Sequence, residues 1–383
     1  MNSVYTQTNE AQNQIINFRR AMDGRLMEVQ RVPTGGHGTG GYVPLTGEAS
    51  SPDSLISSNA VIVSRDRKWL FAVNAGNNTV SAFSIGADGM LTLTDTKPTG
   101  NPVMGQAGTA SSLAFNDKDG VLYVSHSFGP QHIRALGVKD GKLTPRLEAR
   151  SVNLPDRDDR VPTQIALTPD NRYLIACVLF DARPSDAGLV PAADKNLAVF
   201  AIGMGGMLGE PMFKESGGVT PFANAFLNGR SDAFVTVLAA ESAAVFSTIA
   251  ANGNVMSTRP SKIDVGMSAE PSEICWISVS EDNRFAFGAN FGYGTVSIFR
   301  IDDNGLAVKM STAASEMGDG TFKGLAGVAS SGAGDNAVSG GYLYQLYANA
   351  KKLVGYKIGD DGRLTKVTEV AVPYNSTQGL AVA

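Results

Sequence analysis

The stretch LFAVNAGNNTVSAF, residues 70–83, contains a strand-like run, a short turn and a second strand-like run. Apolar and small residues dominate both runs, and the NAGNN segment between them is rich in turn-forming residues. The pattern returns at residues 285–299 as FAFGANFGYGTVSIF. Asp88-Gly89 follows the first copy and supplies the positive φ angles that a tight hairpin needs. The repeated phrase therefore predicts antiparallel sheets built from hairpins.

Turns of the Asp-Gly or Asn-Gly kind, with weaker variants, recur along the whole chain. Each turn glycine is separated from the next by 47 to 65 residues, and the seven are Gly24, Gly89, Gly141, Gly206, Gly253, Gly305 and Gly362. Such a period fits one four-stranded blade with loops of variable length. The sequence therefore predicts a β-propeller with seven blades.

The two ends of the chain complete the count of blades. Residues 377–382 (TQGLAV) resemble an inner strand with no strand after it, and residues 3–9 (SVYTQTN) resemble a second strand with no strand before it. Their pairing removes exposed sheet edges. We therefore predict an all-β protein with one domain over residues 1–383. It is a seven-bladed β-propeller of four-stranded antiparallel blades, closed by the C-terminal strand joining the N-terminal blade.

The charge pattern narrows the classes of partner. The formal net charge is −4 and no basic stripe is present, so a nucleic-acid partner is not expected. No run of about 18 apolar residues occurs, so no membrane span is expected, and the first residues lack the pattern of a signal peptide. We expect a cytoplasmic protein, or an exported one whose signal has been removed. A small-molecule ligand is the expected partner, and the sequence leaves the oligomeric state open.

Cysteine and histidine are too scarce for several kinds of enzyme. The chain has 2 cysteines and 3 histidines, without the spacing of a zinc site and without a Gly-x-Ser-x-Gly elbow between a strand and a helix. A zinc enzyme and an α/β-hydrolase are therefore disfavoured. Cys177 and Cys275 each lie in an apolar run, which predicts buried free thiols, with a disulfide or a nucleophile as the alternatives.

Polar residues at strand ends mark the expected site. In a propeller blade the start of the inner strand and the end of the second strand lie on one face, around the mouth of the channel. Ligand sites are concave places where a few polar groups converge, although an Asn at a strand end can also simply cap a turn. The candidates from this placement are Asn9, Asn74, His126, Gln164, Glu241, Glu273 and Asn290.

Two of these candidates can take part in proton transfer. Glu241 follows the apolar run 237–240, where a carboxylate needs a partner or has its pKa raised, so it is the first candidate for an acid, a base or a ligand. His126 could donate a hydrogen bond or a proton. No cofactor is expected. Calcium is the exception left open, held by Glu241 with Asn9, Asn74 and Asn290.

Two insertions interrupt the repeat. Residues 181–195 fall between the second and third strands of the fourth blade and should overhang the face that carries the site, as a lid or as a solvent loop. The apolar segment 325–328 is the expected inner strand of the seventh blade. The Gly/Ser-rich residues 330–341 would then form an insertion on the opposite face.

The blade phrases resemble those of the seven-bladed lactonase family, which includes propeller-type 6-phosphogluconolactonases and carboxymuconate cyclases. The resemblance rests on residues 70–76 with 79–83, on residues 167–173, and on residues 287–292 with 295–299. It implies a propeller enzyme with a site at the mouth of the channel. Glu241 matches a family Glu at the end of a second strand, and Glu273 matches the family's Glu-Ile phrase.

Other family motifs are missing from this chain. The Pro-His-x-His phrase is replaced by residues 160–164 (RVPTQ), and Phe222 stands in the place of a Gly-Pro-Arg-His phrase. Phe291 replaces the Arg of an Asn-Arg-Gly phrase. Since the family's arginines would bind an anion and a phenylalanine cannot, the resemblance implies a substrate that is less anionic and more apolar or aromatic.

Three functions remain open from the sequence. The first is a lactonase-like or cyclase/isomerase-like enzyme for a small cyclic or aromatic substrate. In this enzyme Glu241 would be acid or base with His126 assisting, and Asn9, Asn74, Gln164, Phe222, Glu273, Asn290 and Phe291 would bind the substrate. The second is a propeller that binds a small molecule or a protein without catalysis. The third is a calcium-dependent lactonase.

Overall fold

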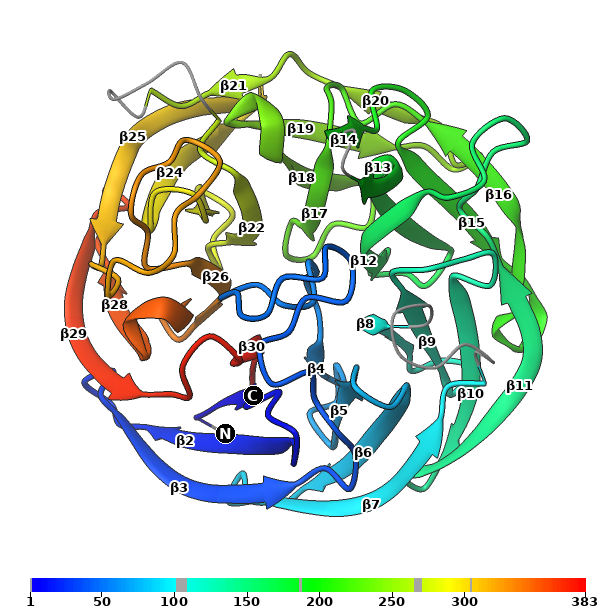
Figure 1. Cartoon of the computed structure of the whole chain (residues 1–383), viewed down its shortest axis with the longest axis horizontal. Helices are drawn as coiled ribbons and strands as arrows, with labels where there is room; N and C mark the ends of the chain where they lie inside the picture. Colours follow the sequence, from blue (N-terminus) through cyan, green and yellow to red (C-terminus); the bar gives the residue numbers. More distant parts are fainter. Residues whose placement is uncertain (1, 101–108, 186–187, 265–270, 304) are drawn as a thin grey trace.

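The computed structural model describes residues 2–383 except 101–108, 186–187, 265–270 and 304. Seven antiparallel sheets, each with a path of four strands, stand around a central axis (Figure 1). The prediction of a seven-bladed β-propeller is confirmed. Within the described residues, no helix has the length and apolar character needed to cross a membrane.

The strands are grouped into blades in chain order. Blade 1 consists of β30 (Gln378–Val382), β1 (Ser3–Gln7), β2 (Gln14–Arg20) and β3 (Leu26–Pro33). Blade 2 consists of β4 (Val61–Val63), β5 (Trp69–Asn74), β6 (Thr79–Ile85) and β7 (Leu91–Pro98). Blade 3 consists of β8 (Ala110–Asn116), β9 (Val121–His126), β10 (Ile133–Lys139) and β11 (Lys142–Arg150). Blade 4 consists of β12 (Val161–Leu167), β13 (Tyr173–Ser185), β15 (Leu197–Ile202) and β16 (Leu208–Lys214), with β14 (Gly188–Pro191) paired to β13.

The remaining blades follow the same plan. Blade 5 consists of β17 (Pro221–Phe226), β18 (Ala233–Leu238), β19 (Ala243–Ile249) and β20 (Val255–Ser257), with β21 (Ser261–Lys262) paired to β19. Blade 6 consists of β22 (Ile274–Val279), β23 (Phe285–Asn290), β24 (Thr295–Asp302) and β25 (Gly305–Ser315). Blade 7 consists of β26 (Ala333–Ser339), β27 (Tyr342–Tyr347), β28 (Lys352–Ile358) and β29 (Leu364–Ala371). Short 3-10 turns are η2 (Met204–Gly206), η3 (Ala239–Glu241) and η4 (Ala348–Ala350).

The ring closes through the first blade. β1 pairs with β30 in antiparallel register, with Val4 opposite Val382 and Thr6 opposite Leu380. Figure 1 shows the two chain ends together in this blade. The predicted closure by the C-terminal strand is confirmed.

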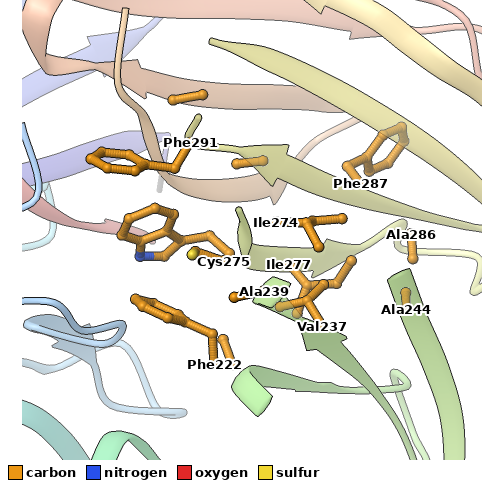
Figure 2. Packing of buried hydrophobic residues seen from close by; sticks show 14 of the residues in the cluster. Phe222, Val237, Ala239, Ala244, Ile274, Cys275, Ile277, Ala286, Phe287 and Phe291 are labelled. Atoms are coloured by element: carbon orange, nitrogen blue, oxygen red, sulfur yellow. The ribbon is translucent and has the colours of Figure 1, made fainter. Parts of the chain in front are cut away.

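Burial explains why the inner strands are so apolar. Every residue of β1 and of β9, the second strands of their blades, is buried, because each blade packs face to face against its two neighbours. The outermost strands have one face in solvent, so β3 and β29 contain many exposed residues. Figure 2 shows part of the largest buried cluster, where Phe222, Ile274 and Phe287 belong to strands of two adjacent blades.

The hairpin turns also join neighbouring blades. The hydroxyl of Tyr5 donates a 2.7 Å hydrogen bond to the carbonyl oxygen of Gly89, and that of Tyr123 donates a 2.6 Å bond to Gly206. Gly89 has φ = 81°, and a Cβ atom there would lie 2.3 Å from Oγ of Ser3. Glycine is therefore required at this turn both by the backbone conformation and by the adjacent blade.

A long connector between blades 1 and 2 occupies the centre of the ring. Residues 34–60 leave β3, pass over the axis and then enter β4 (Figure 1). Ser58 N donates to Thr163 O of blade 4 at 3.1 Å, and Trp276 Nε1 of blade 6 donates to Ser57 O at 3.0 Å. The sequence did not predict this connector as a structural element.

The inner strand of blade 7 was predicted wrongly. The expected strand at residues 325–328 is a loop, and β26 lies inside the segment that was expected to be an insertion. The apolar residues of this loop have the composition of a buried strand, but the side chain of Leu325 is 60% exposed to solvent. β26 is held instead by polar contacts, including Asn336 Nδ2 to Phe287 O at 3.1 Å.

Candidate functional site

A cavity of about 340 Å³ opens at one mouth of the channel. Its lining comes from the connector 43–56, the β13–β14 hairpin, the starts of β17 and β22, η3, Phe291 after β23, and the loop 322–325 before β26. Its volume is in the range of small-molecule sites. Apolar side chains make up most of the wall. Its polar and ionisable side chains include Glu48, Asp53, Thr220, Glu273, Cys275 and Lys323.

Aromatic rings form one side of the cavity. Phe222, Phe291 and Phe322 line the cavity, and the ring centroids of Phe291 and Phe322 are 4.7 Å apart. The buried Trp276, which does not line it, packs with its centroid 4.9 Å from that of Phe222 and 5.9 Å from that of Phe291. Figure 2 shows Phe222 and Phe291 in the packed cluster from which these rings come. Such a wall favours a ligand with an apolar or planar surface.

Glu273 lies directly before β22, in a backbone conformation with φ = 53°. Its Oε2 accepts a 2.9 Å hydrogen bond from the backbone nitrogen of Leu325. A Cβ atom at Gly292 or at Gly324 would lie 2.3 or 2.5 Å from this oxygen, so both glycines make room for the carboxylate. Burial raises the pKa of Glu273 above its ordinary value, and the bond from Leu325 opposes the shift. A carboxyl in this state is suited to accept a proton near neutral pH.

Asp53 is the second carboxyl of the cavity and comes from the connector. Its Oδ1 accepts a 2.9 Å bond from Ile56 N. Burial, and then the charge of Asp335, raise its pKa to about 8, so the group is mostly protonated at neutral pH. The Cys275 thiol has its pKa raised by burial and then by the charges of Glu273 and Asp53, which places it within electrostatic reach of both carboxyls. Cys275 is therefore a thiol and not a thiolate nucleophile.

Three of the predicted binding residues meet at this cavity. Phe222, Glu273 and Phe291 all line it, although they belong to the starts of blades 5 and 6 and to the end of β23. Pro184, Leu189 and Pro191 of the β13–β14 hairpin line it as well. The described residues of the 181–195 insertion thus lie at the face that carries the cavity, as expected. Cys177 and Cys275 are buried free thiols, as predicted.

Glu241 is not among the residues that line the cavity. It ends η3, and its Oε1 accepts a 2.8 Å bond from Val219 N. Its Oε2 lies 3.7 Å from Nζ of Lys262. The sequence placed Glu241 correctly after β18, but the turn of η3 directs the carboxylate toward the neighbouring loop. The role of Glu241 as an acid or a base stays a prediction, and Glu273 is the predicted glutamate that lines the cavity.

Asn74 and Asn290 have their side chains engaged within the protein. Nδ2 of Asn74 donates to Thr79 Oγ1 at 3.0 Å and to Ser81 Oγ at 2.9 Å. Nδ2 of Asn290 makes the equivalent bonds to Thr295 Oγ1 and Ser297 Oγ, at 2.9 and 2.8 Å. Both are buried and join the second strand of a blade to the third. Neither lines the cavity, so their expected role in binding substrate finds no support in its geometry.

Asn9 and Gln164 are also used by the fold. Nδ2 of Asn9 donates to Thr39 Oγ1 and Ser54 Oγ at 3.0 and 2.9 Å, which anchors the connector. Gln164 exchanges two bonds with the backbone of Asn224, through Nε2 at 3.1 Å and Oε1 at 2.6 Å. Neither residue lines this cavity.

His126 is completely buried at the end of β9. Its Nε2 lies 2.8 Å from Thr99 Oγ1, and its Nδ1 lies 3.0 Å from His132 O. Burial lowers its pKa to about 4, so the ring is neutral at ordinary pH. Because His126 does not line the cavity, the structure gives it no direct contact with a ligand there.

The side-chain oxygens of the three asparagines expected to bind calcium take part in hydrogen bonds within the protein. Oδ1 of Asn9 accepts a hydrogen bond from Thr39 N. Oδ1 of Asn74 accepts bonds from Thr34 Oγ1 and Asn13 Nδ2, and Oδ1 of Asn290 accepts one from Ser272 Oγ. In the parts of the chain that the structure describes, no group of three or more His, Cys, Asp or Glu side chains is placed to hold a metal ion. Calcium dependence stays a prediction for a binding experiment.

Comparison with known proteins agrees with the propeller and with the lactonase resemblance. The family model "Lactonase, 7-bladed beta-propeller" matches residues 2–126. The resemblance stated from the blade phrases is thereby confirmed over this part of the chain. No relative among the curated proteins matches.

Solved structures show the same architecture over the full ring. A periplasmic gluconolactonase of Pseudomonas aeruginosa has a TM-score of 0.70 and 16% identity, with 100% of this chain and 98% of that chain covered. A putative 6-phosphogluconolactonase of Bacteroides fragilis has a TM-score of 0.66 and 16% identity, with 100% and 97% covered. A protein from Lactobacillus plantarum has a TM-score of 0.69 and 15% identity, with both chains covered completely. At these identities the likeness establishes the fold.

Proposed function

We propose that this protein is a lactonase-like hydrolase that opens a small, uncharged cyclic ester in the cavity at the channel mouth. The observation that carries the proposal is the position of Glu273, whose carboxylate lies in a mainly apolar, aromatic-walled cavity and has a raised pKa. The partial family match and the fold shared with a gluconolactonase support lactone hydrolysis as the reaction class.

Two carboxyls in different states would share the proton transfers. The ionised Glu273 removes a proton from a water molecule, whose oxygen forms a bond to the lactone carbonyl carbon. The bond between that carbon and the ring oxygen then breaks. Asp53, protonated at neutral pH, gives its proton to the departing ring oxygen and regains one from solvent, while Glu273 releases to solvent the proton that it took from the water molecule. The product is an open-chain hydroxy acid.

The charges of the cavity indicate the substrate class. Among its lining residues, Lys323 is the one cationic side chain, and it lies on the exposed loop before β26. Glu48, Asp53 and Glu273 supply acidic groups, while Phe222 and Phe291 supply apolar surface. A phosphorylated sugar lactone would meet no buried Arg or Lys among these residues, so we propose a neutral lactone with an apolar ring or substituent.

A non-catalytic binding protein is the second candidate. It is favoured by the position of Glu241, because the family-matched carboxylate bonds to Val219 and Lys262 and does not line the cavity. On this alternative, the same aromatic wall binds an apolar ligand that is never converted.

One experiment separates the two candidates. The purified protein and its Glu273→Gln variant are assayed against apolar γ- and δ-lactones, gluconolactone and 6-phosphogluconolactone, with ligand binding followed by melting temperature. Turnover of a neutral lactone that Glu273→Gln abolishes, with binding retained, supports the hydrolase. Binding without turnover by the unaltered protein supports the binding protein. Turnover that survives the substitution contradicts the role of Glu273.

The cellular compartment is open to a separate test. The P. aeruginosa relative is described as periplasmic, which favours the exported alternative for this chain. Fractionation of the producing cells, followed by immunodetection, decides between the exported and cytoplasmic locations.

A further inference from the structure

The cavity at the channel mouth receives chemically different side chains from different blades. Glu273 and Cys275 come from blade 6. Blade 4 contributes residues of the β13–β14 hairpin, and the described ones that line the cavity are all apolar: Leu179, Phe180, Pro184, Leu189 and Pro191. The lining supplied by the blades therefore changes from an acidic group at blade 6 to apolar side chains at blade 4.

Blade 5 lies between these two parts of the cavity. Its inner strand β17 contacts β13 of blade 4 on one side and β22 of blade 6 on the other. Among its lining residues are Ala239 and Ala240 of η3, whose methyl side chains occupy little space. A ligand whose reacting group lies at Glu273 can therefore extend past η3 to the hairpin.

The hairpin presents aliphatic surface that a ligand can reach. The side chain of Leu189 is 45% exposed, and Pro191 is exposed as well. Leu325, beside Glu273, adds a further exposed apolar side chain to the same cavity. Exposed apolar side chains that gather around a cavity are typical of a binding site.

Ion pairs with the loop before β12 hold the stem of the hairpin. Nε of Arg160 lies 2.8 Å from Oδ1 of Asp181, and Nη1 of Arg157 lies 3.0 Å from Oδ2 of the same residue. Arg157 also pairs with Asp194, near the other end of the insertion. Because both ends of the hairpin are fixed, the fold itself positions the apolar wall, and little ordering is needed when a ligand binds.

We propose that the β13–β14 hairpin is the specificity subsite for an unbranched alkyl chain attached to the lactone ring. This inference rests on the proposed hydrolase, because Glu273 fixes where the ring lies. An alkyl chain needs no hydrogen-bond partner, and it gains binding free energy with each methylene group that it buries. It is also narrow enough to follow a path past two alanines.

A series of γ-lactones tests the subsite. They carry an ethyl, butyl, hexyl or octyl group on the ring carbon next to the ring oxygen, and each is assayed for kcat and KM. Kd is measured by calorimetry with the matching alkylcyclopentanones, in which a methylene group replaces the ring oxygen and hydrolysis is impossible. We expect each methylene that reaches the hairpin to lower Kd and KM by about two- to fourfold, with kcat nearly constant.

Leu189→Ser and Val190→Ser are a matched pair of variants. Successive strand residues point to opposite faces, so Leu189 lines the cavity and Val190, which is 47% exposed, does not. We expect Leu189→Ser to weaken binding of the octyl ketone at least about fivefold and that of the ethyl ketone by less than about twofold. Val190→Ser should change neither. A thermal melt checks the fold, and Leu189→Ala serves as the measurement if Leu189→Ser does not fold.

The subsite and the hydrolase can fail separately. Ketone binding that tightens with chain length, without turnover of any lactone, would support the alkyl subsite and contradict the hydrolase. Turnover with Kd and KM independent of chain length would support the hydrolase and overturn the subsite. An octyl ketone that binds Leu189→Ser as tightly as Val190→Ser would also overturn it. A phenyl ketone that binds as tightly as the hexyl ketone would show a subsite for rings instead of chains.

Discussion

The backbone nitrogen of Leu325 donates a 2.9 Å hydrogen bond to Oε2 of Glu273, although the two residues are 52 positions apart in the chain. This bond joins the loop before β26 to the start of β22. It therefore fixes one oxygen of the candidate base and, at the same time, one wall of the cavity. The position of the proposed base and the shape of the cavity depend on the same contact.

Replacing Glu273 by Gln should remove activity while preserving the fold. Gln retains an oxygen that can accept the bond from Leu325 but cannot take a proton from water. We expect kcat for a converted lactone to fall by at least about a hundredfold, with the melting temperature nearly unchanged. Steady-state kinetics and a thermal melt check both parts. A fall in kcat that merely follows a fall in melting temperature would contradict a catalytic role.

Glu241→Gln is the matched carboxylate control. Glu241 contacts Val219 and Lys262 and is not part of the cavity lining, so its neutralisation removes only a partly exposed ion pair. Such pairs contribute about 0–1 kcal/mol. We expect kcat/KM to change by less than about threefold. A large loss of activity would restore Glu241 as the reactive carboxyl and count against Glu273.

The pH dependence of stability should report the buried carboxyls. Asp53 and Asp335 have pKa values of about 8 and about 7 in the folded protein, far above their ordinary values near 4. Between pH 4 and these values the folded state holds protons that the unfolded chain releases. Stability should therefore fall as the pH rises through that window, with each group contributing at most about 1.4 kcal/mol per pH unit.

Asp53→Asn tests this assignment, because Asn cannot ionise but can still accept the bond from Ile56. Urea unfolding from pH 5 to 8.5 should give a flatter profile for the variant, and a greater stability relative to the unaltered protein at the alkaline end. Parallel profiles for the two proteins would show that Asp53 does not titrate in this range.

The aromatic wall should determine affinity more than rate. Phe291 lies between Trp276 and Phe322, and Phe291→Leu keeps an apolar side chain while removing both ring contacts. We expect KM for an apolar lactone to rise several-fold, kcat to change little, and the free energy of unfolding to fall by about 1–2 kcal/mol. The same kinetic measurement with a small unsubstituted lactone, which has less apolar surface to contact the ring, gives the comparison for the change in KM. If kcat alone falls, the ring acts on the reacting groups and not on binding.

Asn74 should matter for stability and not for chemistry. Its carboxamide bonds Thr79, Ser81, Thr34 and Asn13, so Asn74→Ala leaves several buried polar atoms unpaired. We expect a loss of at least about 2 kcal/mol in urea unfolding. Activity per folded molecule should be unaffected.

Asn252→Ala is the control for the asparagine prediction, because Asn252 makes one turn contact, to Asn254 N at 3.1 Å. It should cost less than Asn74→Ala in the same unfolding experiment. Equal losses of unfolding free energy in the two variants would show that the buried hydrogen bonds of Asn74 stabilise the fold no more than the single turn contact of Asn252.

The seven-bladed ring could be predicted because its strands and hairpin turns are determined by residues that are close together in the sequence. Alternating apolar runs and Asp-Gly turns are decided by neighbouring residues, and the blade phrase at residues 70–83 carries both. The same stretch also contains a pattern that predicts the role of its asparagine. Asn74 is followed at the fifth and seventh positions by Thr79 and Ser81, as Asn290 is by Thr295 and Ser297, and these are the hydroxyls that the asparagines bond.

The site was harder to predict because much of it comes from segments without a repeat. Asp53 lies on a connector whose path is set by contacts with blades 1, 4 and 6, and these contacts are distant in sequence. Leu325 resembled a strand residue from its apolar neighbours, yet it belongs to a loop. Glu273 could be named from its place before an inner strand, and Phe222 and Phe291 from the family motifs that they replace; all three line the cavity.

The pairing of β30 with β1 has a consequence for biosynthesis. A ribosome releases β1, β2 and β3 first, and β30 is the last strand of the ring to follow. Until then the first blade lacks its inner strand, and the backbone groups of β1 that will bond β30 are free to pair with another chain. The nascent chain is thus most prone to associate wrongly before β30 is available, and the pairing of β30 with β1 removes that hazard in one step.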